Sequence, residues 1–173
     1  MNIALLNTSI LTTHGASVYA PLTLQQAQWL VNQPSATVTS AIGHDATAQI
    51  LSELLGRDVS VNRIQYKQEL GDVAIVFKLN GRPPEGKILT AEECHAIGFT
   101  FGALITFNMF SLRWWKPSDM PRNLADGCPV LLDSRLSQEP LLGFVCDEGA
   151  GVQIAGGEEF AFAAKGIERV TVI

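Results

Sequence analysis

Short apolar runs alternate with amphipathic stripes through the first half of the chain. Residues 2–6 form an apolar run that ends in a polar turn, which is typical of a buried strand. A loop with Gly15 and Pro21 follows. Thr23 and Gln26 then match the capping-box pattern that precedes many helices, and the apolar positions after them share one helical face. The opening of the chain therefore predicts a strand, a loop and a helix.

The next strand and helix place two polar residues at a helix start. Residues 36–40 alternate β-branched and small residues and predict a second strand. Residues 45–55 carry one apolar stripe, and Gly56 stands where a left-handed helix cap is expected. His44 and Asp45 are therefore expected at the amino end of this helix.

The following residues complete the predicted sheet. Residues 62–67 and 73–79 are expected to form two antiparallel strands joined by a turn at 70–72. A second capping box at 90–93 predicts a short helix, and residues 99–107 a further strand. We expect an α/β fold with a mixed β-sheet flanked by helices.

The pattern changes near residue 111. Residues 114–121, with two tryptophans and two prolines, are expected to be a linker. Beyond them, short apolar runs alternate with glycine-rich turns, which predicts a β-rich C-terminal extension in the form of a small barrel or ribbon. The predicted division is an α/β domain at 1–110 and an extension of unknown role at 111–173.

Composition restricts the classes of function. The 173 residues are 47% hydrophobic and 17% charged, which indicates an ordered globular protein. The net charge of −5 argues against a binder of long DNA or RNA, whose affinity comes from many basic side chains. The three cysteines are an odd number without metal-ligand spacing, so we expect free thiols, no structural metal and no cofactor.

Targeting signals are not recognisable in the sequence. The first residues lack a basic segment followed by a long apolar stretch, and the apolar residues at 103–115 are interrupted by Asn108 and Arg113. We therefore expect a cytoplasmic protein that does not interact with membranes.

His44 is the first candidate for catalysis. A histidine at a helix amino terminus feels the positive end of the helix dipole, which favours release of its proton. Such a residue suits protonation of a departing oxygen in phosphodiester cleavage. The alternative is that His44 only caps the helix, with Asp45 complementing the dipole.

Arg82 and Glu85 flank two prolines, which stiffen the backbone that presents them. An arginine can donate two hydrogen bonds to a phosphate, and a glutamate can orient or deprotonate a ribose hydroxyl. Arg63 is able to add positive potential. The alternative is a solvated surface turn and a solvated edge arginine.

Four separated motifs resemble one known family in order and spacing. They are residues 5–11, residues 40–47, Asn62-Arg63 followed by Gly71-Asp72, and Arg82 to Lys87 with Glu85 between them. Together they resemble the viral ring nuclease family, the type III anti-CRISPR proteins similar to B116-like proteins of archaeal viruses and to bacterial CRISPR-associated ring nucleases. The likeness covers about residues 2–108.

This resemblance implies an α/β homodimer that binds cyclic tetra-adenylate, the second messenger of type III CRISPR systems, and linearises it without a metal. His44 would be the general acid, Arg82 would stabilise the phosphorane, and Glu85 would position His44 or the nucleophile. The resemblance implies ligand-binding roles for the remaining candidates, namely Asn7, Ser9, Thr47 and Arg63.

Two other functions are compatible with the same sequence. A binding protein could sequester the ring without cutting it, although such a sponge needs no proton donor. Alternatively, the chain could act as a structural or partner-binding protein through its C-terminal extension, because a fold does not fix a function.

Overall fold

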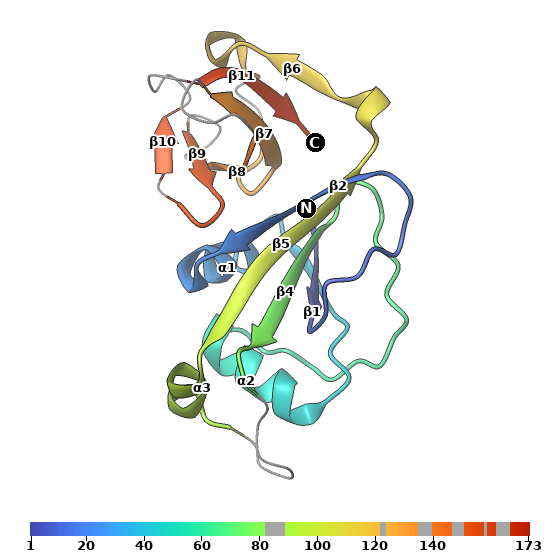
Figure 1. Ribbon diagram of the computed structural model, residues 1–173, viewed down its shortest axis with the longest axis vertical. Helices are drawn as coiled ribbons and strands as arrows, with labels where there is room; N and C mark the ends of the chain where they lie inside the picture. The colour runs from blue at the N-terminus through green and yellow to red at the C-terminus, as the bar shows by residue number, and fades with distance from the viewer. Residues whose placement is uncertain (82–88, 122–123, 135–139, 147–150, 158, 162–166) are drawn as a thin grey trace.

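Two β-sheets follow one another along the chain, and the α-helices accompany the first (Figure 1). This computed structural model describes residues 1–81, 89–121, 124–134, 140–146, 151–157, 159–161 and 167–173. The architecture confirms the expected α/β fold with a β-rich C-terminal part.

The first sheet is mixed and has the strand order β2-β5-β4-β1-β3. β1 pairs in parallel with β3 on one side and β4 on the other, and β5 runs antiparallel to both β4 and β2. The parallel strands therefore end at the same edge of the sheet, where loops and helix starts gather. The strands are β1 (Asn2–Leu6), β2 (Ala16–Leu22), β3 (Thr37–Ser40), β4 (Val73–Leu79) and β5 (Phe99–Phe107).

The helices begin and end where the sequence places their caps. α1 (Leu24–Val31) and α3 (Ala91–Ile97) each start with a complete capping box, in which side chain and backbone bond reciprocally. α2 (Asp45–Leu55) ends at Gly56, whose φ of +63° lies in the left-handed region that favours glycine.

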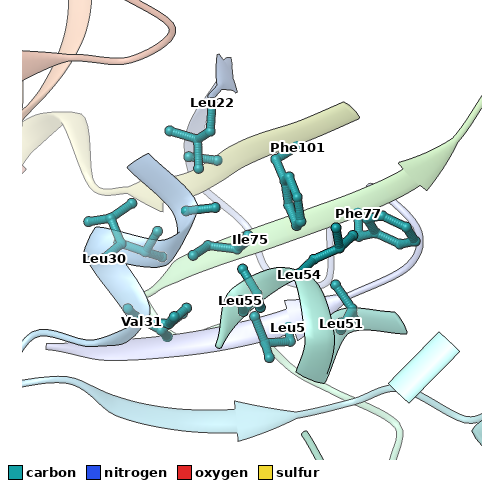
Figure 2. Packing of buried hydrophobic residues seen from close by; sticks show 14 of the residues in the cluster. Leu5, Leu22, Leu30, Val31, Leu51, Leu54, Leu55, Ile75, Phe77 and Phe101 are labelled. Carbon is teal, nitrogen blue, oxygen red and sulfur yellow. The ribbon is translucent and has the colours of Figure 1, made fainter. Parts of the chain in front are cut away.

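The main core lies between the helices and one face of the first sheet (Figure 2). Leucines and valines of α1 and α2 meet apolar side chains of four strands there. The opposite face carries small or aliphatic side chains, and the chain between α2 and β4 crosses part of it. The labelled core residues are Leu5, Leu22, Leu30, Val31, Leu51, Leu54, Leu55, Ile75, Phe77 and Phe101.

Two predictions within this sheet are wrong. Residues 62–67 do not form a strand, because both edges of β4 are already paired, with β1 and with β5. Conversely, the expected loop around Gly15 and Pro21 contains the edge strand β2. A proline is tolerated in an edge strand because one side of that strand makes no ladder bonds.

The second sheet is antiparallel, with the order β10-β9-β8-β7-β11-β6. The expected linker at 114–121 is partly wrong, because Trp114 and Trp115 belong to β6 and pair with β11. A 3₁₀ turn (Pro117–Asp119) follows. The strands are β6 (Arg113–Trp115), β7 (Pro129–Ser134), β8 (Leu141–Cys146), β9 (Gly151–Ile154), β10 (Glu159–Ala161) and β11 (Ile167–Val172).

Gln26 of α1 joins the two sheets. Its amide nitrogen donates to the carbonyls of Ile154 (2.7 Å) and Gly157 (3.2 Å), and its amide oxygen accepts from the nitrogen of Gly156 (2.8 Å). The side chain is only 2% exposed. Leu142 and Phe144 of β8 also belong to the main core, so the second sheet packs against the first.

Candidate functional site

Three adjoining hollows surround the loop that follows β1. The strand-end hollow, of about 350 Å³, is lined by residues of this loop, Thr47 of α2 and the end of β4. A larger hollow of about 700 Å³ lies between the same loop and residues 64–67, and we call it the loop hollow. The third, the tyrosine hollow, measures about 260 Å³ and is lined by Ser9, Ile10, Leu11, Ser17, Tyr19 and Leu104.

The strand-end hollow and the loop hollow lie at the sheet edge where β1 ends, and the tyrosine hollow lies beside β2 and β5. Asn7 and Thr8 line both the strand-end hollow and the loop hollow, and Ser9 lines both the strand-end hollow and the tyrosine hollow. None of the described residues beyond Leu104 lines any of the three. The described part of the C-terminal extension therefore leaves this edge open.

His44 occupies the amino-terminal cap position of α2, as the sequence predicts. Its backbone is extended (φ −130°, ψ 130°), and its side chain makes no hydrogen bond to the helix backbone. The residue is exposed. Its imidazole is therefore not used in side-chain capping of the helix.

Arg63 lies directly beside this helix start. Its Nε donates to the carbonyl oxygen of Gly43, the residue before His44, at 2.7 Å. Asn62 fixes the same segment, because its backbone nitrogen donates to Ile42 (2.8 Å) and its side-chain amide donates to Ser40 (2.9 Å). The Asn62-Arg63 motif is thus attached to the turn between β3 and α2, although the two segments are about twenty residues apart.

Lys78 is a cation of this site that the sequence analysis did not select. It is exposed near the end of β4, and its Nζ donates to Ser9 Oγ at 3.0 Å. The same Nζ lies 5.5 Å from the centroid of the Tyr19 ring. One signal was available in the sequence, because Lys78 interrupts the otherwise apolar run of β4 at its exposed end.

The predicted binding residues Asn7, Ser9 and Thr47 all line the strand-end hollow together with Lys78. Hydroxyl and amide groups facing a cation form a surface suited to a small polar anion. The structure therefore brings these three candidates to one place. Arg82 and Glu85 lie outside the described residues.

Tyr66 lines the loop hollow and packs against the cluster that contains Ala4 and Leu6 of β1. Its hydroxyl donates to Asp72 Oδ2 at 3.4 Å, and Asp72 also accepts from the Asn2 amide at 3.1 Å. Burial is the main cause that raises the pKa of Tyr66 to about 12, and the charge of Asp72 adds to it. The phenol therefore remains neutral at physiological pH.

Metal-ligand clusters and membrane-spanning helices are both absent from the described ranges. These ranges contain no group of three or more His, Cys, Asp or Glu side chains arranged to hold a metal ion. No helix in that part of the chain is long and apolar enough to cross a membrane.

Known proteins match the part of the chain that builds this site. The family model described as STIV B116-like matches residues 3–101. The uncharacterized protein ORF117 of Acidianus two-tailed virus is 41% identical over 76 residues, which are 43% of this chain and 65% of that protein. The uncharacterized protein YddF of Bacillus subtilis (strain 168) is 32% identical over 101 residues, 58% of this chain and 94% of YddF.

A solved structure shares the fold of this region. B116 of Sulfolobus turreted icosahedral virus superposes with a TM-score of 0.51 at 23% identity, over 60% of this chain and 97% of B116. At this level of identity the likeness concerns the fold. The family match ends at residue 101, before the second sheet begins.

Proposed function

Because this chain belongs to the STIV B116-like family, and because its motifs resemble those of ring nucleases, we propose that it binds and cleaves cyclic tetra-adenylate. The product would be a linear oligonucleotide with a 2′,3′-cyclic phosphate end. Removal of this messenger would switch off the ancillary effectors of a type III CRISPR system.

The main support is that Lys78 shares the strand-end hollow with polar residues, and that Arg63 lies beside the start of α2, the helix that contributes Thr47 to this hollow. His44 starts α2, and Arg63 is bonded to the residue before it. Lys78 lies with Thr47 in the strand-end hollow. An overall acidic chain thus has one cation beside a possible proton donor and a second cation in the hollow that the same helix lines, which suits local recognition of a phosphodiester.

The proposed chemistry is an internal transfer at phosphorus. A ribose 2′-oxygen forms a bond to the adjacent phosphorus, and the bond from that phosphorus to the 5′-oxygen breaks. The protonated imidazole of His44 gives its proton to the departing 5′-oxygen, leaving a free hydroxyl. Glu85 would orient His44 or accept the proton of the 2′-hydroxyl, and Arg82 would stabilise the negative charge that develops on the non-bridging oxygens of the phosphorane.

A homodimer suits this ligand. A ring of four identical nucleotides is itself symmetric, and a two-fold interface offers each half the same contacts. Arg63 would then hold phosphate within its own subunit or across the interface.

One incubation separates this proposal from its alternatives. Purified protein is mixed with labelled cyclic tetra-adenylate in the presence of EDTA, and the products are resolved by chromatography. A linear product with a cyclic phosphate end is expected. Tight binding without product would instead indicate a sponge, and neither binding nor cleavage would favour a structural or partner-binding role for the extension.

A further inference from the structure

The Tyr19 side chain lies flat over the neighbouring strand of the first sheet. It stands on the edge strand β2, opposite Leu104 of β5. A Cβ atom added to Gly102 would lie 2.3 Å from the Tyr19 hydroxyl oxygen and 2.8 Å from Cε2 of the ring. The ring therefore covers the backbone of Gly102, and only glycine leaves room for it there.

The ring also reaches toward the candidate site. Gly102 pairs with Val76 of β4, and Lys78 is two residues further along that strand on the same face. The Lys78 Nζ lies 5.5 Å from the ring centroid and donates to Ser9. Tyr19 thus spans from the edge strand, over β5, to the cation that lines the strand-end hollow.

Tyr19 remains open to solvent although it packs on Gly102. The residue is 48% exposed and borders the tyrosine hollow with Ile10, Leu11 and Leu104. A flat aromatic surface next to apolar side chains and a lysine can stack a base while the cation holds the adjoining phosphate.

We propose that Tyr19 is a base-stacking platform, which takes one nucleobase of the ring oligonucleotide while Lys78 holds the neighbouring phosphate. This inference rests on the proposed function and names a specific subsite for it. The strand-end hollow would accept the phosphate, and the tyrosine hollow would accept the base.

The test compares four variants by titration with cyclic tetra-adenylate. Tyr19→Phe keeps the ring and should bind like the unchanged protein, whereas Tyr19→Leu should weaken binding by about 5- to 150-fold, since stacking contributes that range of affinity per base. Gly102→Ala keeps Tyr19 but displaces its ring and should weaken binding similarly. In a Tyr19→Leu background, Gly102→Ala should add little, because the ring that it displaces is gone.

A second measurement reports stacking directly. A ring with 2-aminopurine in place of adenine should lose fluorescence on binding to the unchanged protein and to Tyr19→Phe, and should stay bright with Tyr19→Leu. Circular dichroism on each variant verifies folding. If Gly102→Ala fails to fold, the comparison of Tyr19→Phe with Tyr19→Leu still shows whether the aromatic ring stacks on a base.

The outcomes separate this inference from the proposed function. Unchanged affinity and quenching in Tyr19→Leu, with cleavage intact in the parent protein, would overturn the platform alone. A protein that binds and quenches the ring but never cuts it would overturn the nuclease and leave the platform standing. Absence of ring binding by the parent protein would overturn both.

Discussion

At the scale of single residues, His44 is the clearest test of the proposed chemistry. Loss of a general acid typically slows a reaction by about 10²- to 10⁴-fold, so His44→Ala should reduce cleavage by this factor while affinity for the ring changes much less. Single-turnover kinetics and a binding titration measure the two effects. Gln49→Ala, at an exposed position on the same helix, is the control and should cut normally. A His44→Ala protein that cuts at the parental rate would exclude His44 from the mechanism.

Arg82 and Glu85 are expected to act on the transition state. Replacing either residue with alanine should lower the single-turnover rate at saturating ligand by about tenfold or more, because preorganised charge near the reacting phosphorus is lost. The rate is measured over a series of ring concentrations. Full recovery at saturation would make these residues contributors to binding only.

At Gly56, the cost of a left-handed backbone conformation can be measured without any change in side-chain contacts. Its φ is +63°, and a Cβ added there would meet no atom within 4 Å. Gly56→Ala should therefore destabilise the fold by about 1–2 kcal/mol through left-handed strain alone. Chemical denaturation measures the change, and Gly157→Ala, where the added Cβ comes no closer than 3.6 Å, is the control. Equal stability of the two variants would contradict the strain argument.

At the scale of elements, Gln26 connects α1 to the turn between β9 and β10. The same side chain completes the capping box of α1 and satisfies three backbone groups of that turn. Gln26→Ala removes three hydrogen bonds to this turn, although the Ile154 carbonyl still accepts from the Gly157 nitrogen. At about 1 kcal/mol for each bond, the change should lower stability by about 2–3 kcal/mol. Thermal and urea unfolding measure the loss, with the exposed neighbour Gln25→Ala as control. If Gln26→Ala and Gln25→Ala have the same free energy of unfolding, the hydrogen bonds of Gln26 to the turn contribute little to stability.

At the scale of the whole molecule, the second sheet completes the core of the first. Leu142 and Phe144 are buried in the main core, and Met1 and Trp29 pack against the same cluster. A chain ending at residue 110 would expose this apolar surface, so we expect it to aggregate or to melt well below the full chain. Light scattering measures the aggregation, and circular dichroism measures the melting temperature. A soluble truncated chain with an unchanged melting temperature would show that the extension is autonomous, as its different strand pattern suggests.

The proposed dimer is a further property of the whole molecule. Sedimentation across a range of concentrations should show a two-fold assembly, and cleavage should fall as it dissociates. A monomer that still cuts the ring at low concentration would rule out the shared site.

Local patterns in the sequence determined most elements of this protein. Capping boxes at Thr23 and Thr90 and the left-handed Gly56 fixed helix ends, because these signals depend on atoms within a few residues of each other. A local pattern of the same kind predicted His44 at the start of a helix. The strand β2 escaped detection because Gly15 and Pro21 are typical turn residues, whereas pairing with the distant β5 stabilises Ala16–Leu22, with Pro21 in it, as a strand.

Contacts between distant residues decided the rest. Residues 62–67 look like a strand, yet both edges of β4 are occupied, so they cross the sheet and bring Arg63 to Gly43. Lys78 and Tyr19 meet only because β2, β5 and β4 lie side by side and Gly102 leaves space between them. A sequence specifies which side chains can do chemistry, but register and strand order set which of them meet, since both depend on pairings across the whole chain.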